Sequence, residues 1–419
     1  MNIRDYMTNV GKQSVKASKE IKSLSTIDKN NLLLSIAESI RDEKDKIISA
    51  NQEDINLAKK NNTSKVMINR LMLDNERIEN IAKSVEDIVK LSDPVGRVLY
   101  ETKRPNGLII NRVSVPLGVI GIIYESRPNV TVDASVLCIK AGNVAILRGG
   151  SESFNSNTSL IKAIQLALTK NDLNKDTIQL VETVDRAAVD YMLAEMTDTI
   201  DVIVPRGGKG LVKKVQDMAR VPIIGHLEGI CHIYVNNSAN LETALKIIHN
   251  AKLRRTEICG AAETLLIDQA YAKDNLNKIV TNLHEGGCEI RGDIASQEID
   301  NRILHANEVD WSTEYLDAII AIKLVKNVDE AVEHIAEYGS GHTESIIAED
   351  KEVAEKFLNL VDSAIVMHNT STQFADGGEF GLGAEIGIST GRLHARGPVG
   401  LEGLTTYKYI VKGNGQIRP

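Results

Sequence analysis

Several features that mark whole classes of protein are missing from this sequence of 419 residues. No apolar run approaches the length of a membrane-spanning helix, so we expect no membrane partner. The N-terminal MNIRDYMTNVGKQS lacks the apolar centre of a signal peptide, which predicts a cytoplasmic protein. The net charge of -8 mixes both signs along the chain, whereas a nucleic-acid binder usually carries a basic face, so we expect no nucleic-acid partner.

Cysteine is scarce as well. The four cysteines, Cys138, Cys231, Cys259 and Cys288, are scattered, and no C-x-x-C pair marks a zinc site or a redox dithiol. So few thiols in so long a chain do not make a disulfide framework. The sequence therefore predicts neither a metal site nor a disulfide scaffold.

What is present predicts two or three packed domains. The length exceeds one ordinary core, and 42% hydrophobic with 25% charged residues is typical of a globular chain. The first ninety residues have a helical pattern, in which Leu32, Ile36 and Ile40 recur at helical spacing behind a capping residue at Ser25 or Thr26. This pattern stops at the LSDP segment, because proline disfavours helix at the residue before it.

Two strand segments lie far apart in the chain. In RVLYETKRPNGLIINRVSV, apolar and polar residues alternate around Asn106-Gly107, a dipeptide that readily takes the positive φ angles of a tight hairpin turn. LTTYKYIVKG near the C-terminus alternates in the same way. We expect the two segments to pair with each other and with a second subunit, because an exposed edge is a template for another strand. An edge covered within the same subunit is the alternative.

The middle of the chain alternates strands and helices. PLGVIGIIYE, NVAILRGG, TIQLVE and TIDVIVPRGG have the pattern of strands, and TVDASVLCIKAG and SNTSLIKAIQLALTK have that of helices. Such alternation predicts a doubly wound α/β domain, which binds ligands at the carboxyl ends of its strands.

Two glycine clusters follow such strands: Arg148-Gly149 in ILRGGSES, and Arg206, Gly207 and Gly208 in VIVPRGGKG. Each fits a plain turn when taken alone. Two at adjacent strand ends favour a nucleotide cofactor, because glycines let a phosphate approach the backbone and a helix N-terminus favours negative charge. The G-x-G-x-x-G and G-x-x-x-x-G-K-[ST] fingerprints are absent. An arginine at each cluster could pair with an extra phosphate, which favours NADP over NAD.

Cys259 lies in RRTEICGAAET and has two interpretations. Buried structural thiols are common, so it fits a packed core cysteine. It also fits a nucleophile, because the small residues after it would let a ligand come close. Arg254 and Arg255 could then help to hold a thiolate or an anionic substrate.

Taken together, these motifs resemble the glutamate-5-semialdehyde dehydrogenases, also called gamma-glutamyl phosphate reductases, of the aldehyde dehydrogenase superfamily. The resemblance covers nearly the whole chain through AGNVAILRGG, IDVIVPRGGKG, HLEGICHIYV, RRTEICGAAET and FGLGAEIGIST. His342, Thr343 and Glu344, within EYGSGHTESI, belong to the signature of the family.

The resemblance implies an aldehyde-dehydrogenase-like α/β fold with a doubly wound cofactor domain, an α/β catalytic domain and a small β oligomerisation extension. On this basis residues 1–100 and 116–229 form the NADP-binding domain, 230–390 the catalytic domain, and 101–115 with 391–419 the extension. The implied partner is a second copy of the chain, in a homodimer or a higher homo-oligomer. A complex with glutamate 5-kinase, which makes the labile substrate, is a further expectation.

The resemblance also implies a reaction. NADPH would reduce L-glutamyl 5-phosphate to L-glutamate 5-semialdehyde with release of phosphate, the second step of proline biosynthesis from glutamate. Cys259 falls at the nucleophile position and would form a thioester, with its own backbone N–H as the first oxyanion donor. A hydrolysing aldehyde dehydrogenase and a non-catalytic scaffold are the alternatives.

Two departures from the wider superfamily leave site residues open. Hydrolysing members carry a base in L-E-L-G-G-K, where this chain has GHLEG; an ungapped comparison puts His226 at that position and a two-residue gap puts Glu228 there. A simple hydrogen-bonding role for His226 is equally open. YESRPN replaces P-W-N-F-P, so the second oxyanion donor is undecided, with Glu125 at the aligned position and Asn129 four residues on.

The remaining site residues are implied one by one. Arg148 would contact the adenosine ribose or its 2′-phosphate, Gly207 and Gly208 the pyrophosphate, and Glu314 the nicotinamide ribose. Gly149 and Arg206 complete the expected cofactor set. The residues expected to contact the substrate are Ser126, Arg127, Asn129, Arg255 and Phe380.

Overall fold

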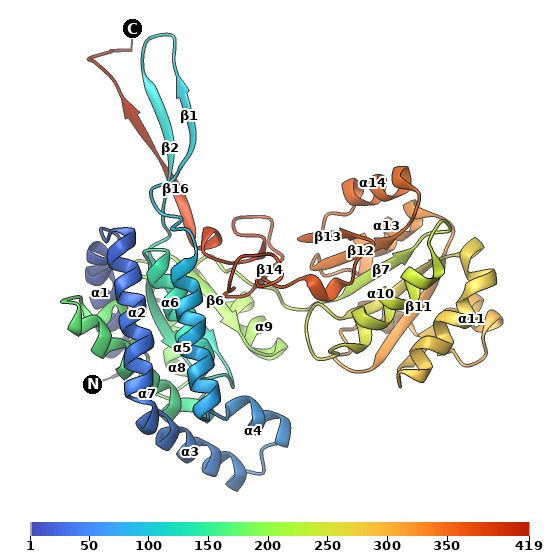
Figure 1. Cartoon of the computed structure of the whole chain (residues 1–419), viewed down its shortest axis with the longest axis horizontal. Helices are drawn as coiled ribbons and strands as arrows, with labels where there is room; N and C mark the ends of the chain where they lie inside the picture. The colour runs from blue at the N-terminus through green and yellow to red at the C-terminus, as the bar shows by residue number, and fades with distance from the viewer. Residues whose placement is uncertain (1, 419) are drawn as a thin grey trace. The chain divides into compact units, whose positions relative to one another are not determined.

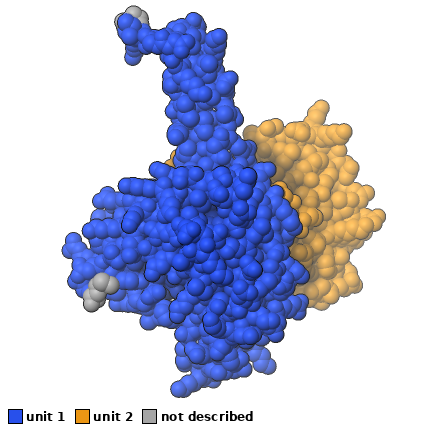
Figure 2. Space-filling view, turned by 60° about the vertical axis from the view of Figure 1, so that its left-hand side comes forward, with its two compact units in different colours: residues 1–225, 382–387, 399–419 blue, residues 226–381, 388–398 orange. Residues whose placement is uncertain are grey.

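The computed structural model describes residues 2–418 and divides the chain into two compact units, which Figure 2 colours separately. Unit 1 comprises Met1–Gly225, Leu382–Gly387 and Val399–Pro419, and unit 2 comprises His226–Gly381 and Ile388–Pro398. The first border between the units follows Gly225, close to residue 229, where the cofactor domain was expected to end. The roles assigned to the two units stay predictions.

Part of the expected C-terminal extension belongs elsewhere. Residues 391–398 pack with unit 2, because β15 (Gly397–Pro398) pairs with β14 (Ile388–Ser389) and Arg396 forms an ion pair with Asp362 at 2.7 Å. The extension therefore begins later than residue 391.

Unit 1 begins with helices α1 (Ile3–Ile21), α2 (Thr26–Asp42), α3 (Lys44–Lys60), α4 (Lys65–Leu71) and α5 (Asn75–Lys90). The predicted cap is confirmed, since the Ser25 hydroxyl accepts from the backbone N–H of Asp28, and the Asp28 carboxylate accepts from that of Ser25. The predicted helix end is also confirmed, because α5 stops at Lys90.

A four-stranded parallel sheet forms the centre of unit 1, in the order β5 (Ile178–Leu180), β4 (Val144–Arg148), β3 (Val119–Tyr124) and β6 (Val202–Arg206). Its strands alternate along the chain with α6 (Asn129–Lys140), α7 (Phe154–Lys170), α8 (Ala187–Ala194) and α9 (Lys209–Met218). α6 and α7 pack with α2, whereas α1 packs against β3, β4, β5 and α8. The expected doubly wound domain is therefore present.

An antiparallel arm projects from unit 1 (Figure 1), built from β1 (Val98–Lys103), β2 (Ile109–Pro116) and β16 (Thr405–Lys412) in that order. The predicted pairing of the two distant segments is confirmed. The predicted tight turn is wrong: five residues, 104–108, separate the paired ends, and Gly107 takes a positive φ of 86° whereas Asn106 does not. Proline 105 lacks an N–H for the ladder, so the loop closes instead through the Gly107 N–H on the Arg104 carbonyl.

Unit 2 has a seven-stranded parallel sheet in the order β10 (Leu304–His305), β9 (Glu289–Gly292), β11 (Ile319–Val325), β8 (Ala262–Asp268), β7 (Cys231–Val235), β12 (Thr343–Ile347) and β13 (Ile365–His368). Its helices are α10 (Leu241–Leu253), α11 (Gln269–Glu285), α12 (Ile294–Ile299), α13 (Val328–Tyr338) and α14 (Lys351–Leu360). Unit 2 also contains the short 3-10 turns η3 (Glu308–Ser312) and η4 (Thr372–Phe374), whereas η1 (Ser151–Ser153), η2 (Lys175–Thr177) and η5 (Glu402–Leu404) belong to unit 1.

The two faces of this sheet are buried in separate cores. Ile233 and Val235 pack with residues of α10 and α11, whereas Tyr234 between them packs with residues of α13 and α14. Because successive strand residues point to opposite faces, helices cover both sides. Within residues 2–418, no helix combines the length and the apolar character needed to cross a bilayer.

Candidate active site

Cys259 lies half-buried in the loop between α10 and β8. The loops that precede β7, β11 and β12 carry His226, Glu314 and His342. Since β11, β8, β7 and β12 are consecutive neighbours in a parallel sheet, these loops meet at one edge, formed by the amino ends of the strands. The carboxyl-end rule for α/β sheets does not describe unit 2.

The segment GHLEGIC packs directly on the cysteine loop. A Cβ added at Gly229 would lie 2.2 Å from the Cys259 carbonyl oxygen and 2.7 Å from its Cα, so only glycine fits there. The thiol of Cys231 donates to the same carbonyl at 3.1 Å. These contacts fix the position of the Cys259 backbone.

A buried ion pair closes the base of the cysteine loop. Lys252 at the end of α10 and Glu263 at the start of β8 lie 2.5 Å apart, and neither side chain is exposed. Gln373 adds a second tie, because its amide nitrogen donates to the carbonyls of Ala251 and Arg255 at 3.0 and 2.9 Å. Sequence reasoning missed Gln373, since nothing in the STQFAD segment marks a partner more than a hundred residues away.

His226 and His342 lie beside the thiol. One ligand atom from each, together with the Cys259 Sγ, forms a cluster whose members all lie within 4.8 Å of one another. Nδ1 of His226 is 2.7 Å from the Ile388 carbonyl, which only accepts, so Nδ1 carries a proton and the neutral form of the ring has its lone pair on Nε2. The two rings meet edge to face at 4.8 Å.

His342 is completely buried. Its Nδ1 lies 2.9 Å from the Thr343 hydroxyl and 3.6 Å from the Cys231 thiol. Burial, and then the nearby His226 ring, lower the pKa of His342 to about 3, so the ring is neutral near pH 7. His342 was expected only as part of a signature, because sequence distance gave no sign that it approaches the thiol.

The two residues considered for the base position differ in their surroundings. His226 belongs to the cluster around Cys259, and Glu228 does not.

Glu314 accepts from the backbone N–H of Gly229 at 2.9 Å, which ties the β11 loop to GHLEG. The predicted role of Glu314 at the nicotinamide ribose stays a prediction.

The arginines beside Cys259 have other partners. Arg255 forms an ion pair with Glu257 at 3.0 Å, and Arg254 donates to the Gln373 side-chain oxygen at 3.3 Å. Phe380 is 45% exposed in the loop after η4. None of these contacts tests the predicted substrate roles of Arg255 and Phe380.

In unit 1, Arg148 ends β4 and is largely buried. Its guanidinium donates to the carbonyls of Gly149 and Val184 at 2.5 and 3.0 Å, and its Nε has no hydrogen-bond partner among the described residues. Burial lowers the pKa of Arg148, against the opposing effect of Glu152. Gly149 is required by close packing, since a Cβ there would lie 2.2 Å from the Asn157 amide.

The second glycine cluster leads into the N-terminus of α9. Arg206 ends β6, and Gly208 is the N-cap residue. The Glu125 carboxylate accepts from the Gly208 N–H at 3.0 Å, and a Cβ at Gly207 would lie 2.5 Å from the same carboxylate. An anionic group therefore already lies at this helix N-terminus, which favours negative charge.

The three other predicted contacts follow β3 in unit 1. Ser126 takes a positive φ of 53°, and both its backbone N–H and its hydroxyl donate to Glu152. Asn129 donates to Asp133 within the first turn of α6 at 2.9 Å. Arg127 is exposed. The predicted substrate residues are thus divided between the two units.

Comparison with known proteins identifies the family. Residues 5–288 match the aldehyde dehydrogenase family. The chain is 55% identical to the gamma-glutamyl phosphate reductase of Paramagnetospirillum magneticum, over 99% of this chain and 97% of that protein. It is 54% identical to that of Bartonella henselae, over 99% and 100%. The crystal structure of gamma-glutamyl phosphate reductase from Thermotoga maritima superposes with a TM-score of 0.97 at 44% identity, covering 99% of this chain and 100% of that one. The chain therefore belongs to the aldehyde dehydrogenase family and, within it, to the gamma-glutamyl phosphate reductases.

Proposed function

We propose that this chain reduces L-glutamyl 5-phosphate to L-glutamate 5-semialdehyde with NADPH and releases phosphate, the second step of proline biosynthesis from glutamate. Relatives with the corresponding name match nearly the full chain at 52–55% identity. The observation that carries the proposal is the half-buried thiol of Cys259 beside His226.

His226 is the proposed base for the thiol. The Ile388 carbonyl holds the proton on Nδ1, so Nε2 can accept the Cys259 proton. The thiolate then attacks the acyl carbonyl, the C–S bond forms, and the carbon–oxygen bond to phosphate breaks. Phosphate leaves with the electron pair and needs no further acid.

The backbone N–H of Cys259 is the proposed oxyanion donor. It suits that role because Gly229, Cys231 and the Lys252–Glu263 pair hold the loop in place before substrate binds. A fixed donor stabilises the charge that develops on the carbonyl oxygen without reorganising during the reaction.

The described residues fit a nicotinamide dinucleotide. The proposed pyrophosphate contact is the start of α9, where the Glu125 carboxylate accepts from the Gly208 N–H; this contact supports the proposal because the group it holds there is an anion. Arg148 has an Nε donor with no partner among the described residues, which supports a contact with the cofactor and a preference for NADP. When bound, the cofactor supplies the hydride that reduces the thioester carbonyl.

The reverse reaction tests the proposal. Pyrroline-carboxylate, with its open semialdehyde, is supplied with NADP⁺, and NADPH is followed with and without inorganic phosphate. Wild type should form NADPH only with phosphate, Cys259→Ala should form none, and NAD⁺ should be the poorer oxidant. Cys288→Ala is the control, because Cys288 lies in the hydrophobic core formed with α10 and α11. Oxidation that ignores phosphate would identify a hydrolysing dehydrogenase instead.

A further inference from the structure

The cluster around Cys259 has the composition of a metal site. It combines one thiol with two imidazoles, from the loops that precede β7, β8 and β12, and its ligand atoms lie within 4.8 Å of one another. Thiolate and imidazole are the ligands that Zn²⁺ prefers, whereas Mg²⁺ and Ca²⁺ prefer oxygen. No other group of this kind is present in residues 2–418.

A second observation points to a ligand independently. Nε2 of His342 is buried and has no hydrogen-bond partner among the described residues. An unsatisfied buried polar atom is uncommon, because it costs roughly 1–3 kcal/mol. Since the Thr343 hydroxyl lies against Nδ1, Nε2 is the nitrogen of this ring that is left for a ligand.

The surroundings also orient both imidazoles. The Ile388 carbonyl accepts from Nδ1 of His226, and the Thr343 hydroxyl lies 2.9 Å from Nδ1 of His342. The carbonyl fixes the His226 tautomer with the proton on Nδ1, and such partners on the far nitrogen accompany metal-bound histidines almost without exception. The Thr343 hydroxyl can accept from an Nδ1–H of His342, which is the arrangement that metal binding at Nε2 requires.

We propose that Cys259 Sγ, His226 Nε2 and His342 Nε2 bind one Zn²⁺ ion, with the fourth position open to water. Zn–S and Zn–N bonds of about 2.3 and 2.0–2.1 Å place tetrahedral ligand atoms roughly 3.3–3.6 Å apart. Binding at that spacing requires side-chain rotations that bring atoms within 4.8 Å closer together, and Cys259 and His226 are both only partly buried. Binding forms the Zn–S bond and releases the thiol proton to solvent.

The consequence is reversible inhibition, which rests on the proposed function. A thiolate bound to Zn²⁺ cannot attack the acyl phosphate, and a His226 bound to Zn²⁺ cannot accept its proton. The absence of a C-x-x-C spacing predicted no metal site, but these ligands are separated by 33 and 83 residues (226 to 259, 259 to 342) and meet only through the order of the strands.

Cobalt gives a test that does not depend on activity. Metal-free full-length protein is titrated with Co²⁺, and Zn²⁺ is then added to displace it. Wild type should bind one equivalent, with a thiolate-to-cobalt charge-transfer band and the intense ligand-field bands of a four-coordinate ion. His226→Gln, His342→Gln and Cys259→Ala should each weaken binding at least about tenfold, and Cys259→Ala should lose the charge-transfer band. Cys288→Ala should bind like wild type.

A wild-type protein without these bands would overturn the proposal. So would binding that both histidine variants leave unchanged, because the metal would then be held by the thiol alone. His226 is only partly buried, so His226→Gln keeps the test valid if His342→Gln does not fold. The reverse reaction separates the two proposals. If the protein binds cobalt but forms no NADPH in the presence of phosphate, the metal site stands and the proposed function is rejected. If it forms NADPH only with phosphate but shows no cobalt site, the metal site alone is rejected.

Discussion

Gly229 shows how a single residue fixes the nucleophile. The position of a Cβ there coincides with the Cys259 backbone, so Gly229→Ala has to push the cysteine loop away. A displacement of about 1 Å at a reacting group can cost on the order of 100-fold in rate, and we expect a fall in kcat of that size. The rate at which iodoacetamide labels Cys259 should change as well.

Gly210 in α9 is the matched control for this glycine. A Cβ there meets nothing within 4 Å. Gly210→Ala should leave the labelling of Cys259 unchanged and should stabilise α9 by about 0.5–1 kcal/mol, because alanine favours a helix. Equal labelling rates in Gly229→Ala and wild type would show that the close approach does not position the thiol.

His334 predicts how the stability of unit 2 depends on pH. Burial, and then electrostatic interaction with the neighbouring His232 and Lys323, lower its pKa to about 2. As pH falls below about 6.5, the unfolded chain takes up a proton that the folded ring refuses, so stability falls by up to about 1.4 kcal/mol per pH unit for this group. His334→Gln should therefore make the loss of unfolding free energy between about pH 7 and pH 5 shallower.

Trp311 makes this prediction measurable. It is the one tryptophan of the chain, and its ring lies 5.6 Å from that of His334, so its fluorescence in urea reports the unfolding of unit 2. The control is His305→Gln, at an exposed position, which should keep the wild-type slope. A slope unchanged in His334→Gln would mean that this ring accepts its proton in the folded state.

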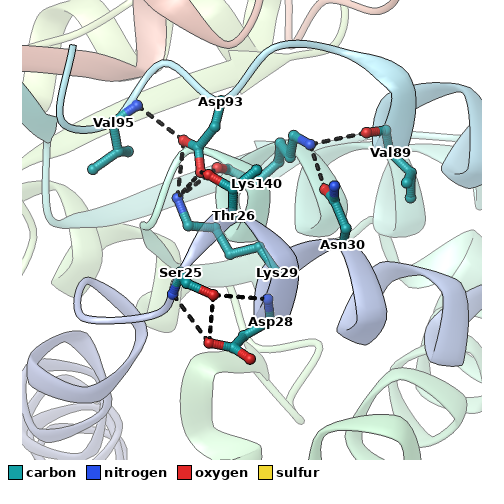
Figure 3. A network of polar contacts seen from close by, with 9 residues as sticks. All are labelled: Ser25, Thr26, Asp28, Lys29, Asn30, Val89, Asp93, Val95 and Lys140. Carbon is teal, nitrogen blue, oxygen red and sulfur yellow. Dashed lines mark hydrogen bonds and ion pairs between the residues drawn. The ribbon is translucent and has the colours of Figure 1, made fainter.

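At the scale of elements, a buried polar network joins the helices of unit 1 (Figure 3). Lys29 on α2 lies 2.7 Å from Asp93, which follows α5, with side-chain exposures of only 1% and 8%. Asp93 also accepts from the Thr26 hydroxyl and the Val95 N–H. Lys140 at the end of α6 donates to the Val89 carbonyl on α5 at 3.0 Å. The network therefore ties α2, α5 and α6 together.

Asp93→Asn should destabilise unit 1 by roughly 3–5 kcal/mol, because it leaves the buried Lys29 ammonium without its counter-charge. Urea unfolding followed by circular dichroism measures the change. Asp87→Asn is the control: Asp87 pairs with Lys90 at a similar distance of 2.6 Å, but both side chains are exposed, and exposed pairs contribute little. Similar losses in the two variants would show that burial is not what makes the Asp93 pair matter.

The sequence predicted the helices and strands better than the contacts between residues that are far apart in the chain. The Ser25 cap, the end of α5 and the strands of the doubly wound sheet depend on local signals, which a sequence carries in full. The site in unit 2 depends on strand order, because β7, β8, β11 and β12 become neighbours only in the folded sheet. The tie made by Gln373 and the approach of His342 to Cys259 were therefore out of reach.

At the scale of the whole molecule, the arm formed by β1, β2 and β16 is the part of the chain from which we predict self-association. Tyr407, Tyr409 and Val411 alternate along β16 and are 49–60% exposed. Tyr409 and Tyr100 both pair with Arg112 in the register of the sheet, so they share one face. β1 and β16 are also the two edges of the arm. Exposed apolar side chains on a strand edge favour pairing with another chain, and we propose that a second copy covers this face.

Sedimentation velocity measures the oligomeric state of the wild type and of variants in the arm. Tyr407→Ser/Tyr409→Ser should shift the protein toward monomer, because it removes apolar contact area from the proposed interface without touching the core of unit 1. Lys408→Ser changes the residue between them, which points to the opposite face, and should leave the assembly unchanged. If the double variant sediments like wild type, the arm does not join subunits, and the exposed tyrosines serve another purpose. If Lys408→Ser dissociates the protein as well, the interface involves the strand edge rather than one face.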